Sequence, residues 1–318
     1  MSKEKEIKKQ RFTKFSYRVM DIDVRDKAGV DKCSSKDTAK LVLVGEGVFP
    51  ITKDAEGKHI NDCPQTGLQI AGTIQGEGKL AGTPSLFIRL ASCNLRCIWQ
   101  MVDGSFCRCD TSYASFHPDD KKTWDIAEIV LLVKHNIGEM QHVVITGGEP
   151  LLQKNGVTEL CKAIKQELDL HITIETNGTL YDEKLTQFVD LFSISPKLSN
   201  SVPSSEKLTF YKEEETGASR YHHEVRRNIP VLQNYIDSAK DLQLKFVVGM
   251  QSDADEIISD YLNVLERYNK QDIMLMPLGA THEQIEQSNP IVLQLCIQNG
   301  WKYTPRIHIE IFGSKQGV

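Results

Sequence analysis

The sequence predicts an α/β protein whose core is an open, partial β/α barrel of about six parallel strands. Short apolar, β-branched segments alternate with amphipathic helical patterns from about residue 85 to the C-terminal end of the chain. This alternation is typical of parallel βαβ units. About six such strands are too few for a closed eightfold barrel. We therefore expect an open barrel, with the functional side chains at the carboxyl ends of its strands.

The composition indicates a soluble globular protein that acts on a small molecule. The chain has 318 residues, of which 40% are hydrophobic and 25% are charged, and its net charge is −5. A negative net charge argues against nucleic acid or an anionic membrane as the partner. The sequence has no run of about 18 apolar residues and no hydrophobic N-terminal segment, so we expect a cytoplasmic protein.

The first 67 residues are expected to form an N-terminal extension of the main domain. Lysine and glutamate dominate its start, as is typical of a frayed terminus. Residues 41–44 read as a strand, but glycine, aspartate and lysine recur around them. The extension could therefore hold a small β appendage, and the barrel domain is expected to cover residues 68–318.

The barrel domain contains strand and helix patterns in alternation. After a short strand that begins at residue 68, the expected strands cover residues 85–91, 142–146, 171–175, 191–195, 242–248, 272–276 and 306–311. The expected helices cover residues 123–134 and about 155–168, 253–268 and 284–298. A polar segment at 198–228 interrupts this order, and we expect it to be a surface insertion.

Four of the eight cysteines lie close together, directly after the strand expected at residues 85–91. They are Cys93, Cys97, Cys107 and Cys109. In a cytoplasmic protein, clustered cysteines more often bind a metal than form structural disulfides. Thiolates suit both iron and zinc, so we predict an iron–sulfur cluster held by three of them, with a structural zinc knuckle in a binding protein as the alternative. The absence of two CxxC pairs argues against zinc.

Polar residues also follow the other expected strands. Each of them, taken alone, is explained by a tight turn or a solvated strand end. Because the carboxyl ends of the strands meet at one end of a barrel, we expect these residues to gather around one site. They are Glu77, Gly147, Gly148, Glu149, Glu175, Asn177, Ser195, Lys197, Lys245 and residues 276–279.

A CxxxC pair after a strand, followed one strand later by a Gly-Gly-Glu-Pro turn at 147–150, resembles the radical S-adenosylmethionine superfamily. The resemblance implies a [4Fe–4S] cluster held by three cysteines, whose fourth iron chelates the amino and carboxylate groups of S-adenosyl-L-methionine. It also implies that the Gly-Gly-Glu-Pro backbone passes along the methionine amino group, where the glycines permit close approach.

A longer series of motifs resembles one family, the 7-carboxy-7-deazaguanine synthases. The resemblance runs from about residue 68 to the end of the chain. Its motifs are Gln-Gly-Glu-Gly at 75–78, Gly-Thr-Pro-Ser at 82–85, Phe-Ile-Arg at 87–89, Cys-Asn-Leu-Arg-Cys at 93–97, Cys-Asp-Thr at 109–111, Thr-Gly-Gly-Glu-Pro at 146–150, Ile-Glu-Thr-Asn-Gly at 174–178, Ser-Pro-Lys at 195–197, Arg-Ile-His at 306–308 and Gly-Val at 317–318.

This family resemblance implies a lyase reaction. The pterin 6-carboxy-5,6,7,8-tetrahydropterin would be contracted to 7-carboxy-7-deazaguanine with loss of ammonia, as in deazapurine or queuosine-type biosynthesis. A 5′-deoxyadenosyl radical would take a hydrogen from the pterin carbon that bears the carboxylate. The family further implies Mg²⁺, an electron donor of the flavodoxin or ferredoxin type, and a homodimer. The alternative is a radical S-adenosylmethionine activase that acts on a partner protein and has no need of the Cys-Asp-Thr segment.

The resemblance also implies a role for individual residues. The cluster would be held by Cys93, Cys97 and Cys109, and Mg²⁺ would be held in part by Thr111. S-adenosyl-L-methionine would be bound by Gly147, Gly148, Glu149, Glu175, Asn177, Ser195 and Lys197. The pterin would be bound by Gln75, Glu77, Arg89, Thr146, His308 and the terminal carboxylate of Val318.

The third cysteine departs from the family pattern. The family run is CxxxCxxC, whereas here residues 98–108 form an insertion before Cys109. Closing a loop of this length costs only about 1–2 kcal/mol more, so ligation remains feasible. Cys107 is the alternative third ligand. We favour Cys109 because it opens the Cys-Asp-Thr segment that the Mg²⁺ hypothesis requires.

Overall fold

The computed structural model of the chain describes residues 39–62, 64–118, 120–313 and 315. The prediction of a frayed first segment therefore lies outside the described residues. Residues from Thr38 onward form one compact unit, and the following description concerns this unit alone. None of the helices in its described part is long and apolar enough to cross a membrane.

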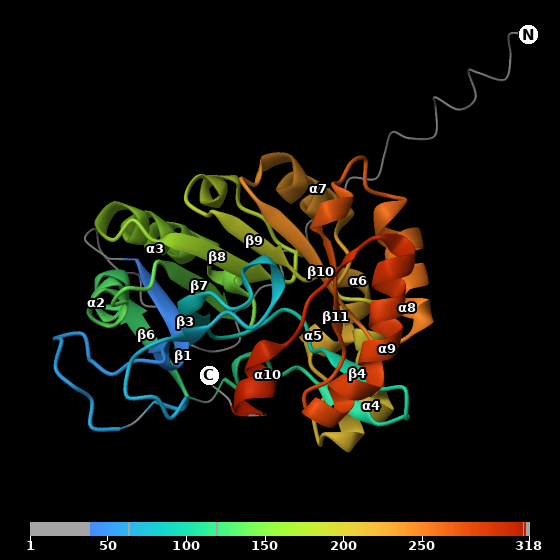
Figure 1. Cartoon of the computed structure of the whole chain (residues 1–318), viewed down its shortest axis with the longest axis horizontal. Coiled ribbons are helices and arrows are strands. Elements are labelled where there is room, and N and C mark those ends of the chain that lie inside the picture. Colours follow the sequence, from blue (N-terminus) through green and yellow to red (C-terminus); the bar gives the residue numbers. More distant parts are fainter. Residues whose placement is uncertain (1–38, 63, 119, 314, 316–318) are drawn as a thin grey trace, which may run out of the picture. The chain divides into compact units, whose positions relative to one another are not determined.

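One open sheet forms the core of this unit (Figure 1). Its parallel strands, in order along the sheet, are β3 (Pro84–Leu90), β7 (His142–Gly147), β8 (His171–Thr176), β9 (Leu191–Ile194), β10 (Leu242–Val248), β11 (Ile273–Pro277) and the short β12 (Lys302–Tyr303). At the other edge, β1 (Lys40–Phe49) and β6 (Lys121–Asp125) are antiparallel, and β2 (Thr73–Ile74) pairs with β3. The sheet thus ends at β6 and β12, which confirms the predicted open, partial barrel.

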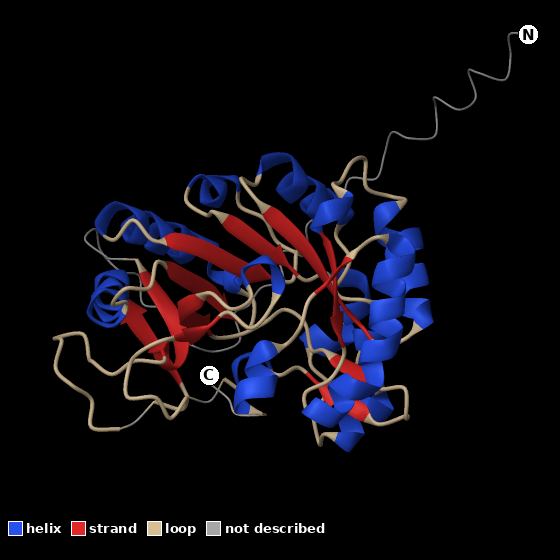
Figure 2. Ribbon diagram, in the orientation of Figure 1, coloured by secondary structure: helices blue, strands red, loops and turns tan. Residues whose placement is uncertain are grey.

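The longer helices form a layer outside the strands (Figure 2). They are α2 (Ile126–Asn136), α3 (Lys154–Glu167), α7 (Ile229–Ser238), α8 (Gln251–Glu256), which continues into a π-helical turn at Ile257–Leu262, and α9 (His282–Asn299). The shorter helices are α1 (Ser112–Ser115), α4 (Ser205–Phe210), α5 (Gly217–Arg220), α6 (His222–Val225) and α10 (Ile307–Phe312). Single 3-10 turns occur at Gly78–Leu80, Pro150–Gln153, Glu183–Gln187, Ser199–Ser201 and Lys270–Asp272.

The two faces of the parallel strands differ in chemistry because successive side chains point to opposite faces. One face is apolar and belongs to the main hydrophobic core with the outer helices; its residues include Leu86, Ile88, Val143, Ile145, Ile172, Ile174, Leu244 and Phe246. The other face carries the intervening positions and lines a cavity; its residues include Phe87, Arg89, Thr146, Glu175, Ser193, Ser195, Lys245 and Met276. The strand alternation therefore separates the core from the site.

One predicted element has the wrong type, and two predicted helices have different bounds. The segment expected as a helix from residue 123 begins as strand β6, because residues 121–125 pair with β1, and the helix starts at Ile126. The strand expected at 306–311 is the helix α10, in which the N–H of Ile307 donates to the carbonyl of Gly76 at 3.0 Å. Its isoleucines alternate as in a strand, but β12 takes the place beside β11. The helix expected at 253–268 ends earlier, at Leu262.

The strand expected at residues 41–44 is part of β1. This strand pairs with both β3 and β6, so it extends the main sheet and is not a separate β appendage. The loop that follows β1 is fastened to α2 by the buried amide of Asn136. Its Oδ1 accepts from the N–H groups of Thr52 at 2.8 Å and Lys53 at 2.9 Å, and its Nδ2 donates to the carbonyl of Lys53.

The insertion at 98–108 is a β-hairpin. Its strands β4 (Ile98–Gln100) and β5 (Phe106–Arg108) pair antiparallel, with Trp99 opposite Cys107. The insertion at 198–228 packs on this hairpin. Arg108 forms an ion pair with Glu213 at 2.6 Å, and the hydroxyl of Tyr211 donates to the carbonyl of Phe106 at 2.8 Å. We call these two insertions together the cap.

We predict that Asn136→Ala lowers the free energy of unfolding by about 1–3 kcal/mol, because it leaves the loop N–H groups without their acceptor. Urea unfolding followed by circular dichroism measures this loss. Asn299→Ala is a matched control. Asn299 also ends a helix, but its side chain donates to the carbonyl of Leu295 within that same helix. Equal losses in the two variants would contradict the role of Asn136.

Candidate active site

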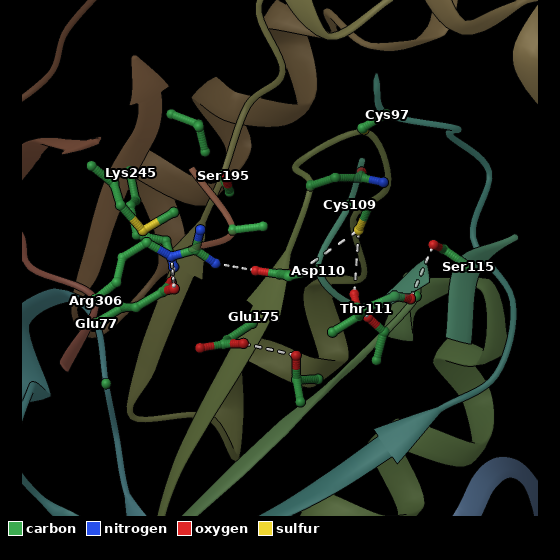
Figure 3. Close-up of a pocket in the computed structure, with 18 of the residues that line it drawn as sticks. Glu77, Cys97, Cys109, Asp110, Thr111, Ser115, Glu175, Ser195, Lys245 and Arg306 are labelled. Carbon is green, nitrogen blue, oxygen red and sulfur yellow. Dashed lines mark hydrogen bonds and ion pairs between the residues drawn. The ribbon is translucent and has the colours of Figure 1, made fainter. Parts of the chain in front are cut away.

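A cavity of about 240 Å³ opens at the carboxyl ends of the parallel strands. Figure 3 shows thiol groups on one side of it, a group of charged side chains on the other, and Asp110 between them. Most residues predicted from the sequence line this cavity: Gln75, Glu77, Arg89, Cys93, Cys97, Cys107, Cys109, Thr111, Thr146, Gly147, Gly148, Glu175, Asn177, Ser195, Lys197 and His308. Glu149 does not, and Val318 lies outside the described residues.

The loop between Cys93 and Cys97 is held from several directions. The N–H of Leu95 donates to the sulfur of Cys93 at 3.4 Å. The Arg96 side chain folds back and donates to the carbonyls of Cys93 at 2.7 Å and Leu95 at 3.0 Å. The amide Nδ2 of Asn94 donates to the hydroxyl of Thr179, beyond the end of β8, at 2.8 Å. These bonds fix the loop before any ligand binds.

The hairpin of the cap returns Cys109 to Cys97. Its pairing continues past Ile98 and Arg108, because the N–H of Cys109 donates to the carbonyl of Cys97 at 3.1 Å. Cys97 and Cys109 therefore lie opposite each other at the open end of the hairpin, whereas Cys107 lies two pairs nearer the turn, opposite Trp99. The insertion thus lengthens the chain without separating Cys97 from Cys109.

Burial strongly affects the pKa of the four clustered cysteine thiols. Burial raises the pKa of Cys93 and Cys107 to about 12 and also raises the pKa of Cys97 and Cys109. Negative charge on Cys109 raises the pKa of Cys93 and Cys97 further, and Cys93 acts in the same way on Cys97. Among these four described thiols, Cys109 is the only one that affects Cys107. Three thiols that influence one another in this way, one buried and two half-buried, fit the ligands of a metal cluster.

Among the residues that the structure describes, no three cysteine, histidine, aspartate or glutamate side chains converge closely enough to hold a single metal ion. The cysteines instead lie around the cavity, as the spaced thiolates of a cluster would.

Gly147 and Gly148 let the end of β7 approach the cysteine loop. A β-carbon on Gly147 would lie 2.2 Å from the carbonyl oxygen of Leu90, and one on Gly148 would lie 2.0 Å from that of Ser92. The N–H of Gly148 donates to Leu90 at 3.0 Å, and the N–H of Glu149 donates to Ser92 at 2.8 Å. No larger residue fits this contact without a backbone shift, so the glycines place the cysteine loop at the cavity.

Glu149 is a positioning residue, since its carboxylate is fully buried behind the cavity. One oxygen accepts from the Thr176 hydroxyl at 2.8 Å and from the N–H of Leu151 at 3.0 Å, and the other accepts from the N–H of Asn177 at 2.7 Å. These bonds join the end of β7 to the end of β8. The prediction that Glu149 itself contacts the cofactor therefore finds no support in its position.

Asn177 links this joint to the cysteines. Its Nδ2 donates to Asn94 at 2.8 Å and lies 3.9 Å from the sulfur of Cys93. On the next strand, the ammonium of Lys197 donates to the hydroxyl of Ser195 at 2.6 Å. Lys197 also lies near enough to the thiols to lower the pKa of Cys97 against the larger effect of burial. These side chains bring polar groups and one positive charge to the thiol side of the cavity.

Glu77 is the centre of the charged side of the cavity. It forms ion pairs with Lys245 and with Arg306 at 3.2 Å, and its carboxylate lies 3.8 Å from Nε2 of His308. Burial alone would raise the pKa of Glu77, but Lys245 and Arg306 lower it far below its usual value. The same pairing raises the pKa of Lys245 against the effect of burial. Glu77 is therefore a fixed, ionised acceptor.

Arg306 connects the two sides of the cavity. Besides Glu77, it pairs with Asp110 and donates to the carbonyl of Gly279. Burial would raise the pKa of Asp110, but Arg306 lowers it. The neighbouring Thr111 hydroxyl lies 3.4 Å from both the sulfur of Cys109 and the carbonyl oxygen of Gly147. The sequence analysis included Arg306 only within a motif and gave it no role, since its contacts cross from the C-terminal segment to the cysteine loop.

Arg89 and Glu175 lie on the floor of the cavity. The guanidinium of Arg89 stacks on Phe49 at 4.8 Å, and within the described part of the chain its buried Nε has no hydrogen-bond partner. Glu175 accepts from Gln75 at 3.1 Å and from Thr146 at 2.7 Å. The cavity thus offers a buried guanidinium that forms no ion pair within the described residues, beside carboxylates that are already held in place.

We predict that Glu77→Gln destabilises the protein at pH 7 by about 3–5 kcal/mol, because it leaves Lys245 and Arg306 unbalanced. Since the folded-state pKa of Glu77 lies below its ordinary value of 4.5, its stabilising effect is complete above that pH and is lost as the pH falls. The difference between parent and variant should therefore narrow by about 0.8 kcal/mol at pH 4. Urea unfolding at both pH values tests this, and a constant difference would contradict it.

Comparison with known proteins gives the family. Residues 88–202 match the Radical SAM superfamily. The 7-carboxy-7-deazaguanine synthase of Halobacterium salinarum is 35% identical over 266 residues, covering 82% of this chain and 96% of the relative. That of Rhodopirellula baltica is 34% identical, covering 85% and 96%. The crystal structure of QueE from Escherichia coli is similar with a TM-score of 0.49 and 20% identity, covering 74% of this chain and 90% of that one. With relatives of this identity covered almost end to end, the chain belongs to the 7-carboxy-7-deazaguanine synthase family of radical S-adenosylmethionine enzymes.

Proposed function

We propose that the protein converts 6-carboxy-5,6,7,8-tetrahydropterin to 7-carboxy-7-deazaguanine with loss of ammonia. The observation that carries this proposal is one cavity that joins the thiols of Cys93, Cys97 and Cys109 to Arg89 and to the ionised carboxylate of Glu77. In the described part of the chain, the buried Nε of Arg89 has no hydrogen-bond partner. A radical cofactor and a small anionic substrate would need these two sides to be adjacent. Family membership supports the same reaction.

The cluster would be held by Cys93, Cys97 and Cys109. Their mutual closeness, and the hairpin that brings Cys109 back to Cys97, support this set over one that contains Cys107. When bound, the cluster and S-adenosyl-L-methionine supply a 5′-deoxyadenosyl radical that removes a hydrogen from the pterin. The protein's own task is then to orient the two ligands and keep water away from them.

The residues proposed to orient S-adenosyl-L-methionine surround the thiols. The backbone of Gly147 and Gly148 lines the cavity beside the cysteine loop, where it would meet the methionine amino group. Ser195 and Lys197, which are paired with each other, would meet the ribose and the carboxylate. Asn177 and Glu175 would lie near the cofactor as well, while Glu149 would act indirectly by holding the backbone of Asn177.

The charged side of the cavity suits a pterin. A pterin ring presents N–H donors, for which the ionised carboxylate of Glu77 is a strong acceptor. Gln75, Thr146 and Glu175 form a hydrogen-bonded group next to it. The unpaired guanidinium of Arg89 suits the pterin carboxylate, because a planar guanidinium binds a carboxylate in bidentate fashion. His308 would close over the ring from α10, together with the terminal carboxylate of Val318.

Mg²⁺ is proposed to lie between the two sides. The Thr111 hydroxyl lines the cavity and would be a hard oxygen ligand, and the substrate carboxylate would supply further oxygens. Asp110, which lies between the two sides, is paired with Arg306. An electron donor of the flavodoxin or ferredoxin type, a homodimer and a cytoplasmic location are proposed from the family alone.

The decisive experiment is anaerobic turnover. Reduced, cluster-loaded protein is incubated with the carboxypterin and S-adenosyl-L-methionine, with and without Mg²⁺, and the deazaguanine chromophore is measured. We expect product, and more of it with Mg²⁺. Formation of 5′-deoxyadenosine without the deazaguanine product would contradict the proposal and favour an activase. Protein that takes up zinc but neither iron nor sulfide would exclude both the synthase and the activase.

We predict that Cys97→Ala and Cys109→Ala each abolish the visible absorbance of the reconstituted cluster, whereas Cys107→Ala retains it. Cys107→Ala is the matched control because its thiol lies in the same hairpin and is as buried as that of Cys97. Absorbance and iron content per chain are measured after anaerobic reconstitution. A colourless Cys107 variant together with a coloured Cys109 variant would overturn the assignment of the third ligand.

A further inference from the structure

A buried histidine of the cap lies directly behind the cysteine loop. His222, on α6, is fully buried, and its Nδ1 accepts from the backbone N–H of Arg96 at 3.1 Å. Arg96 is the residue immediately before Cys97. The bond therefore connects the second insertion of the cap to the backbone that carries two of the proposed cluster ligands.

The hydrogen bonds of His222 define its tautomer. The hydroxyl of Ser201 donates to the carbonyl of Leu198 at 2.6 Å, so it is free to accept from the Nε2–H of His222 at 3.1 Å. Nδ1 is then the unprotonated nitrogen that accepts from Arg96. The imidazole thus forms a rigid link between the cysteine loop and the segment that follows Lys197.

The cap is itself fastened to the barrel next to this link. Arg226, at the end of α6, is buried and donates to the carbonyl of Lys197 at 2.9 Å and to Glu256 at 2.7 Å. His222 is therefore held from the side away from the cysteines. On the other side of the loop, Asn94 is bonded to Asn177 and Thr179. The loop is anchored at residues 94 and 96, two of the three residues between Cys93 and Cys97.

We propose that His222 is a positioning residue that fixes the Cys93–Cys97 loop and so slows the loss of the iron–sulfur cluster. This inference rests on the proposed ligation by Cys93, Cys97 and Cys109. A cluster held by only three thiolates depends on the order of the loop that supplies two of them. Groups that orient metal ligands without touching the metal commonly change metal affinity by about 10- to 100-fold when they are removed.

The test compares two substitutions at this position with one at its neighbour. His222→Phe keeps a ring of similar shape but removes the acceptor, and His222→Asn restores an acceptor oxygen near the position of Nδ1. His223→Phe is the matched control, because His223 is the next residue on the same helix and is exposed. Each full-length protein is reconstituted anaerobically. Iron release to a chelator, the thermal midpoint of the apoprotein and turnover are then measured.

We expect His222→Phe to release iron about tenfold faster than the parent, His222→Asn to release it at a rate closer to the parent's, and His223→Phe to match the parent. Unchanged iron release in His222→Phe would overturn the inference. A second result would also overturn it: His222→Phe and His222→Asn release iron equally fast, and their thermal midpoints fall by the same amount. His222 would then only fill space. A parent protein that takes up no iron would instead refute the proposed function.

Discussion

The site depends on one backbone contact, the close approach of Gly147 and Gly148 to the end of β3. The contact leaves no room for a β-carbon at either glycine, and two backbone hydrogen bonds close it. This contact fixes where the chain leaves β3, and it therefore fixes the position of Cys93. Glu149 extends the same joint to β8 and to Asn177, whose amide lies beside Cys93. Three neighbouring strand ends are thus held as one rigid edge around the thiols.

The opposite side of the cavity is organised by charge. Burying a carboxylate or an ammonium alone is costly, so such groups persist only in balanced sets. Glu77 and Asp110 are balanced by Lys245 and Arg306, which come from β10 and the start of α10. Arg89 stands outside this balance: its charge rests against the rings of Phe49 and Tyr113. The cavity therefore has a place for one more anion, and binding it would complete the balance.

Much of the barrel and of the site could be predicted from the sequence, because both follow from local patterns. β-Branched runs gave the parallel strands, and residues at their ends gathered at one cavity, as barrel geometry requires. The predictions failed where distant contacts decided the outcome. Residues 121–125 form a strand only because β1 lies beside them, and the alternating isoleucines of α10 form a helix that is fastened to Gly76. No local pattern marks Arg306 or His222 as partners of the cysteine loop, since their contacts span more than 100 residues.

The cap explains why the insertion between Cys97 and Cys109 is tolerated. A hairpin by itself is marginally stable in water, and a mobile one would leave Cys109 poorly placed. Here the second insertion covers the hairpin through Arg108, Tyr211 and Asn200. The same insertion reaches the cysteine loop through His222 and the barrel through Arg226. Each insertion therefore supplies the surface that orders the other, and together they keep Cys109 beside Cys97 despite the eleven residues between them.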